Sequence, residues 1–235
     1  MKPHEKWEVL PHGELEQLAD NLWVVEGKLP MPLGETTRHM TIVRLTDGRL
    51  AIFSAIALDD AHMAQLEALG TPTFLIVPSG IHRIDAKPWK DRYPHIQVVA
   101  PEQACVRISE VVDVETTTPD LGDPHVRLEY IPGTDRRELA MIVETSTGKT
   151  LVINDLIFNM PAMKGFAGWA YRLMGFRPGQ PTIPKLIKKK LVKNDNEVRT
   201  KLRDWAALDG LERIIVAHGA AITEPRKTLL ELATA

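Results

Sequence analysis

Residues 73–85 read T-F-L-I-V-P-S-G-I-H-R-I-D. The first half is a continuous apolar run, which is typical of a strand that is covered on both faces of a sheet. His82 and Asp85 follow directly after that strand. Because open α/β sheets bind ligands at the carboxyl ends of their strands, both side chains are candidate functional groups. Asp85 has a simpler alternative, which is to cap the short helix predicted for A-K-P-W-K-D.

The segments before this stretch predict antiparallel strands followed by a helix. L-W-V-V-E at 22–26 and M-T-I-V-R-L at 40–45 are rich in β-branched residues. The second run continues through T-D-G into L-A-I-F-S-A-I, a hairpin pattern in which Gly48 takes positive φ. Residues 59–70 predict a helix with an acidic first turn and a closing glycine, and we expect His62 on its exposed face.

The segments after it alternate in the same way. Short helices and the strand I-Q-V-V-A are followed by hairpin strands, an amphipathic helix capped by Asn196 or its acidic neighbours, and the buried strand L-E-R-I-I-V-A-H-G. This order predicts an α/β protein in which residues 1–235 form a single domain, a four-layer αβ/βα sandwich with two mixed sheets.

The region 160–195 has the least regular pattern and is expected to be a helical insertion or a lid. It contains glycine-flanked aromatic residues and a basic stripe made by Lys185, Lys188, Lys189, Lys190 and Lys193. Such a stripe indicates either a surface for an anionic partner or a solvated helix that covers the sheet.

The amino-acid composition and net charge bear on the kind of partner that the protein binds. The chain has 235 residues, a formal net charge of −2 and 44% hydrophobic residues, as in an ordinary globular protein. This balance gives no support for nucleic acid or an anionic membrane as the main partner, and the partner we expect is a small-molecule ligand or substrate. The single cysteine, Cys105, has no internal disulfide partner. No apolar run is long enough to span a membrane and no secretory signal is seen, so a cytoplasmic location is expected.

Three predicted strand ends carry polar residues that suit a metal ion. They are His82 with Asp85, Asp155 after T-L-V-I-N, and His218 after R-I-I-V-A. Two imidazoles and two carboxylates at one edge would suit zinc, manganese or iron. A buried carboxylate at Asp155 needs a hydrogen-bond or metal partner, whereas each histidine taken alone could be structural.

The order of these segments resembles the metallo-β-lactamase superfamily from about Leu22 to Ile222. The resemblance places the superfamily's H-x-H-x-D-H motif on G-I-H-R-I-D, so that only its second histidine remains, as His82. Gly80, Ile84 and Asp85 then stand at the other motif positions, and Thr134 replaces the histidine of P-G-H. Asp155 matches the bridging aspartate and His218 the histidine of the last strand. The chain is similar to a divergent subgroup whose metal motif is eroded.

The resemblance and the changed motif residues leave two functions open. In the first, which we favour, the protein is a divergent hydrolase with one divalent metal, zinc before manganese or iron, held by Asp85, Asp155 and His218. His82, a fourth candidate ligand, and Asp155 would then serve catalysis on an ester-type or phosphoester-type small molecule. In the second, the chain is a non-catalytic binding protein that kept the fold without metal.

Overall fold

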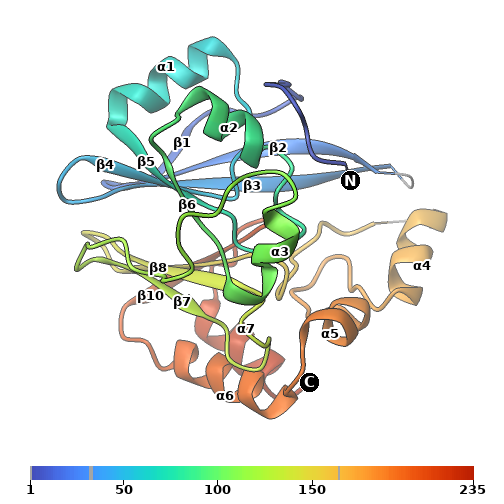
Figure 1. Cartoon of the computed structure of the whole chain (residues 1–235). Helices are drawn as coiled ribbons and strands as arrows, with labels where there is room; N and C mark the ends of the chain where they lie inside the picture. The colour runs from blue at the N-terminus through green and yellow to red at the C-terminus, as the bar shows by residue number, and fades with distance from the viewer. Residues whose placement is uncertain (1, 32–33, 164) are drawn as a thin grey trace.

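The computed structural model describes residues 2–31, 34–163 and 165–235 and arranges them in four layers (Figure 1). Two β-sheets face each other in the middle, with α1 and α2 over the outer face of one sheet and α6 and α7 over the outer face of the other. The first sheet has the order β1-β2-β3-β4-β5-β6 and the second has the order β10-β9-β8-β7. Each contains both antiparallel and parallel pairs, which confirms the predicted αβ/βα sandwich with two mixed sheets.

The element bounds are as follows. The first sheet consists of β1 (Glu16–Ala19), β2 (Leu22–Met31), β3 (Gly34–Arg44), β4 (Arg49–Phe53), β5 (Thr71–Ile76) and β6 (Gln97–Val99). The second sheet consists of β7 (Val126–Tyr130), β8 (Leu139–Glu144), β9 (Lys149–Ile153) and β10 (Leu211–Val216). The helices are α1 (Asp60–Leu69), α2 (Ala86–Arg92), the short 3-10 helix η1 (Glu102–Ala104), α3 (Cys105–Ile108), α4 (Gly165–Leu173), α5 (Lys185–Leu191), α6 (Asp195–Ala206) and α7 (Pro225–Leu232).

Local sequence signals explain where several elements begin and end. Gly48 has φ 85° in the turn between β3 and β4, as the hairpin requires. Helix α1 begins after Asp59, whose carboxylate accepts the backbone N–H of His62 at 2.9 Å. Helix α6 is capped by Asn194, which accepts from Glu197 N–H, so the expectation of a cap at Asn196 or at its acidic neighbours Asp195 and Glu197 was wrong.

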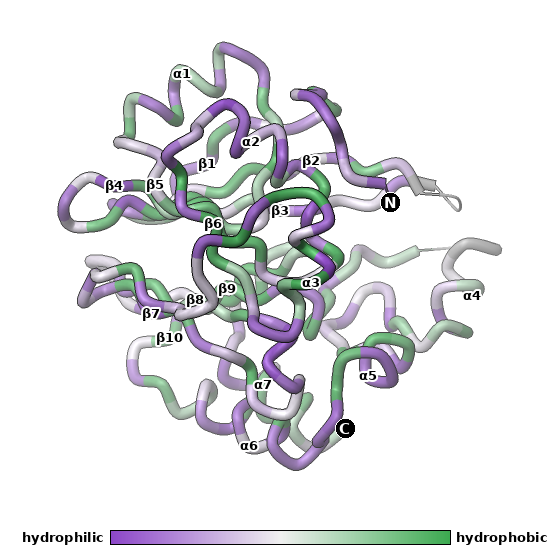
Figure 2. Tube along the Cα trace, in the orientation of Figure 1, coloured by the Kyte–Doolittle hydropathy of each residue, from purple (hydrophilic) through white to green (hydrophobic). Residues whose placement is uncertain are grey.

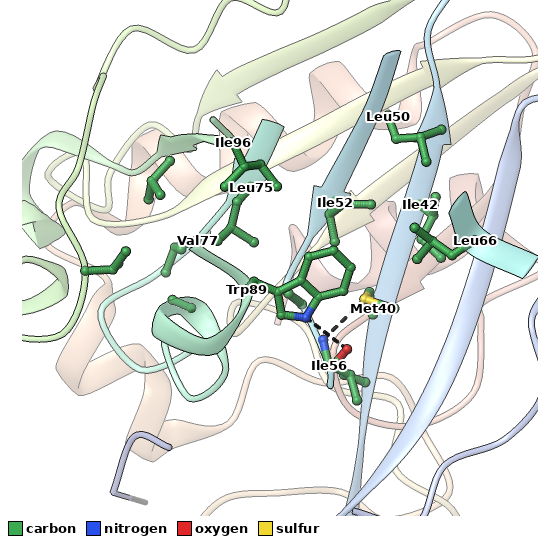
Figure 3. Close-up of a cluster of buried hydrophobic side chains, with 14 of the residues drawn as sticks. Met40, Ile42, Leu50, Ile52, Ile56, Leu66, Leu75, Val77, Trp89 and Ile96 are labelled. Carbon is green, nitrogen blue, oxygen red and sulfur yellow. Dashed lines mark hydrogen bonds between the residues drawn. The ribbon is translucent and has the colours of Figure 1, made fainter. Parts of the chain in front are cut away.

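Three hydrophobic clusters fill the spaces between the layers. One lies between the first sheet and its helices, one between the two sheets, and one between the second sheet and α6 and α7. Figure 2 shows hydrophobic residues gathered around β8 and β9 in the middle of the molecule and hydrophilic residues along α6. In the first cluster Trp89 is fully buried, and its indole N–H donates to Ile56 O at 3.1 Å (Figure 3). The buried indole therefore also has its polar atom satisfied.

The region 160–195 contains α4 and α5, which lie together at one side of the sandwich (Figure 1). Met160 and Phe176 of this region form a small buried cluster with Phe158. Lys164 lies outside the described residues. A role of this region as a lid stays a prediction. Among the described residues, no helix is both long and apolar enough to cross a membrane.

Candidate metal centre

Three of the four predicted ligands lie together at one edge of the molecule. His82 follows β5 in the first sheet, and Asp155 and His218 follow β9 and β10 in the second. Because β9 and β10 are parallel neighbours, their carboxyl ends lie at the same edge. One ligand atom from each of the three residues lies within 4.8 Å of the other two. The two sheets thus contribute jointly to the site.

Asp155 is the centre of the hydrogen-bond network. Its side chain is 8% exposed, and its Oδ1 accepts from His82 Nε2 at 3.0 Å. The hydroxyl of Ser79 donates to Oδ2 at 2.9 Å. His218 Nε2 lies 3.8 Å from Oδ1. Both carboxylate oxygens therefore have partners, and the carboxylate is held in one orientation.

The protonation states of Asp155 and His218 suit a cation. Burial by itself would raise the pKa of Asp155, but the charge and hydrogen bond of His82, with smaller effects from His218 and Ser79, lower it to about 2. Burial and the neighbouring His82 lower the pKa of His218 to about 4. At neutral pH the site therefore contains an ionised carboxylate and a neutral imidazole, which are the forms that bind metal ions.

Backbone and side-chain contacts fix both imidazole rings. His218 Nδ1 donates to Thr37 O at 2.7 Å, so the neutral ring presents the lone pair of Nε2 toward Asp155. Phe158 stacks on the same ring at 4.9 Å between centroids. His82 Nδ1 bonds the hydroxyl of Ser54 at 3.0 Å. Ring nitrogens held in this way by outer partners are typical of metal-binding histidines.

Asp85 lies outside this group. It occupies the N-cap position of α2, but its side chain makes no capping hydrogen bond. Its carboxylate is fully buried, where one oxygen accepts from the Arg38 guanidinium and the other lies 2.9 Å from His4 Nδ1. The structure thus brings His82, Asp155 and His218 together and engages Asp85 in a separate ion pair.

Two residues of the site were missed in the sequence. Ser54 directly follows β4 and has φ 57°, a conformation that is uncommon for a serine. The predicted strand L-A-I-F-S-A-I continued past Ser54 to Ile56, so the rule that found Asp155, a polar residue at a strand's carboxyl end, did not apply to it. Glu138 is fully buried beside Asp155, and its Oε1 accepts from Leu156 N–H at 3.1 Å. Burial and the charge of Asp155 raise its pKa well above the usual range, which favours the neutral form of this carboxyl.

The positions at which the resemblance expects further ligands have other roles here. Ile84 is buried and apolar. Thr134 is fully buried, and its hydroxyl donates to Ile131 O at 2.7 Å within a turn. Gly80 carries no side chain. None of the three offers a metal ligand, which is why the site rests on three side chains.

A second group of histidines and a carboxylate lies at the start of α1. Contrary to expectation, the side chain of His62 is only 14% exposed, because it bonds Asp59 at 2.8 Å and Glu14 at 3.1 Å. The ring of His12 lies 4.8 Å away, edge-on, and its Nε2 accepts from Asp59 N–H. These contacts give the group a structural role, since Asp59 caps the helix and both histidines are already bonded.

No family model matches the sequence, and no curated protein sequence matches it. Solved structures do match over nearly the whole chain. A metallo-β-lactamase from Pontibacter korlensis is 11% identical with a TM-score of 0.62, covering 94% of this chain and 98% of that one. The metallo-β-lactamase DIM-1, in a crystal exposed to ceftazidime, is 11% identical with a TM-score of 0.65, covering 97% and 99%. FIM-1 from Pseudomonas aeruginosa, in a mono-zinc form, is 14% identical with a TM-score of 0.62, covering 96% of each chain.

The fold of this chain is therefore the metallo-β-lactamase fold, as the order of the sequence segments predicted. At 11–14% identity the likeness establishes the fold alone, and the chemistry must be argued from the residues of this chain.

Proposed function

We propose that this protein is a one-metal hydrolase of an ester-type or phosphoester-type small molecule, with His82, Asp155 and His218 as its metal ligands. The observation that supports this most is the convergence of two imidazoles and an ionised carboxylate within 4.8 Å of one another. Three protein ligands leave an open position for a water or substrate atom, as in catalytic zinc sites. The sequence favoured Asp85, Asp155 and His218 as ligands. Because Asp85 is paired with Arg38, we now propose His82 in its place.

A bound divalent ion would supply Lewis acidity and a lowered pKa for water at this edge of the sheets. The protein's own contribution is to orient the ligands. Ser79 donates to Asp155, and Thr37 O fixes the tautomer of His218. His82 Nε2 must give up its proton before it can bind a cation. The hydroxyl of Ser54 can then accept from Nδ1–H, because a hydroxyl both donates and accepts.

The alternative is a binding protein without metal. It is favoured by the direct His82–Asp155 hydrogen bond of 3.0 Å, which satisfies the carboxylate with protein groups alone. In that case the network of Ser79, His82 and Asp155 would be a structural link between the two sheets.

Metal content separates the two functions. The protein is purified without a histidine tag or chelator, and metal per chain is measured by inductively coupled plasma mass spectrometry before and after incubation with zinc, manganese or iron. We expect about one equivalent, its loss in His218→Ala, and its retention in the control His125→Ala, which changes a half-exposed histidine away from the site. Absence of metal after incubation, or equal loss in both variants, would refute the one-metal hydrolase and leave the binding protein.

A further inference from the structure

A cavity of about 460 Å³ opens beside Asp155 and contains three cationic side chains. Arg107 comes from α3, Arg137 from the turn before β8, and Lys190 from α5. These elements are far apart in the sequence, so the fold itself gathers the positive charge. Among the described residues that line the cavity, Asp155 is the one carboxylate.

Arg107 lies over Gly80 on one wall of this cavity. A Cβ atom added to Gly80 would lie 3.2 Å from Arg107 Cδ and 3.6 Å from its Cβ. The first distance is shorter than side-chain carbons normally approach, so the arginine fills the space in which a residue-80 side chain would lie. Because residue 80 is glycine, the side chain of Arg107 can lie beside the site.

The positive charge in the cavity is largely unneutralised. Within the described part of the chain, Arg107 and Lys190 form no ion pair. Arg137 is 43% exposed and has only a distant partner, with its Nε 3.7 Å from Asp135 Oδ2. By contrast Lys188, two residues before Lys190, pairs with an aspartate at 2.7 Å. The cations that face the cavity are those that remain available to a ligand.

We propose that this cavity binds the phosphoryl group of a small-molecule substrate. A phosphomonoester carries a charge of about −1.5 to −2 at neutral pH, which needs more than one cation, whereas a carboxylate needs one. Arginine matches the geometry of phosphate oxygens, and lysine adds a point charge. The inference rests on the proposed function for the identity of the reacting site, because Asp155 contributes to both the ligand set and the cavity wall.

Phosphate binding to metal-free protein tests this inference. The full chain, stripped with chelator and then freed of it, is titrated with inorganic phosphate by isothermal titration calorimetry at low ionic strength. We expect binding that is weakened about fivefold in Arg107→Gln and in Lys190→Met, the loss typical of one partly solvated charge pair. Lys190→Arg keeps the charge and should keep the affinity.

The matched control is Lys189→Met, which removes a lysine of the same helix that does not line the cavity. Acetate serves as the competing ligand class and should bind more weakly than phosphate. The inference is overturned by absence of phosphate binding, by equal affinity for acetate, or by an equal loss in Lys189→Met and Lys190→Met. Since no metal is present in the titration, these results are independent of whether the metal-content experiment supports the hydrolase.

Discussion

Replacement of Asp155 by asparagine removes the charge at the centre of the site with almost no change in shape. The carboxylate has partners on both oxygens, His82 Nε2 at 3.0 Å and Ser79 Oγ at 2.9 Å. Asparagine offers one acceptor and one donor in their place, so neither hydrogen bond has a charged acceptor any longer. We expect the metal-free Asp155→Asn protein to fold and to be less stable than the wild type at pH 7.

The size of this effect follows from the pKa of Asp155. The charge of His82 and the hydrogen bonds outweigh burial and lower this pKa from 3.8 to about 2. At 1.36 kcal/mol per pH unit, the difference corresponds to about 2 kcal/mol of folding stability. A lowered pKa contributes stability that is complete above pH 3.8 and is lost as the pH falls toward 2. The difference between wild type and variant should therefore be largest near neutrality and should shrink in acid.

Urea denaturation of the metal-free proteins at several pH values between 7 and 2 measures this difference. Asp209→Asn, which changes an exposed aspartate before β10, is the matched control and should alter the free energy of unfolding little. An Asp155→Asn protein as stable as the wild type at pH 7 would refute the electrostatic reasoning. A difference that grows as the pH falls would do the same.

Three further results are expected. Ser54→Ala removes the partner of His82 Nδ1 and should weaken metal binding about 10- to 100-fold, measured by competition with a chromophoric chelator, with little loss of fold. Gly219→Ala should destabilise the protein by about 2–4 kcal/mol in thermal unfolding, because φ is 98° there and the new Cβ would lie 1.9 Å from a backbone oxygen. The hydrogen bond to Asp59 raises the pKa of His62. The stability that this bond contributes should therefore be complete below pH 6.5 and be lost as the pH rises past the raised pKa. Asp59→Asn should lower the pKa of His62 in an NMR titration, and an unchanged pKa would contradict this assignment.

The fold and the three residues that converge in the candidate site were predictable because both depend on local patterns. Apolar runs bounded by turn residues identified β5, β9 and β10, and the polar residue after each strand identified His82, Asp155 and His218. The parallel pairing of β9 and β10 then brings two of these residues to one edge. Strand-end reasoning works because carboxyl ends of neighbouring parallel strands share an edge whatever the rest of the chain does.

The partners of these residues were not predictable, because they come from distant segments. Arg38 reaches Asp85 across 47 residues, and Glu138 is buried beside Asp155 at the start of an apolar strand. Nothing in the local sequence around Asp85 distinguishes a buried ion pair from a helix cap. The cap of α6 was misplaced for a different reason, since Asn194 and Asn196 are equivalent by residue type and only the backbone decides between them.

The ion pair between Arg38 and Asp85 gives the loop after β5 a permanent internal counterion. A guanidinium does not lose its proton, so Arg38 balances the charge of the buried Asp85 whether or not a metal ion is bound nearby. The same fixed charge repels a second cation from this position. If the proposed metal is bound, chelators should therefore leave the loop ordered and His82 in place, so that the centre could take up metal again without refolding.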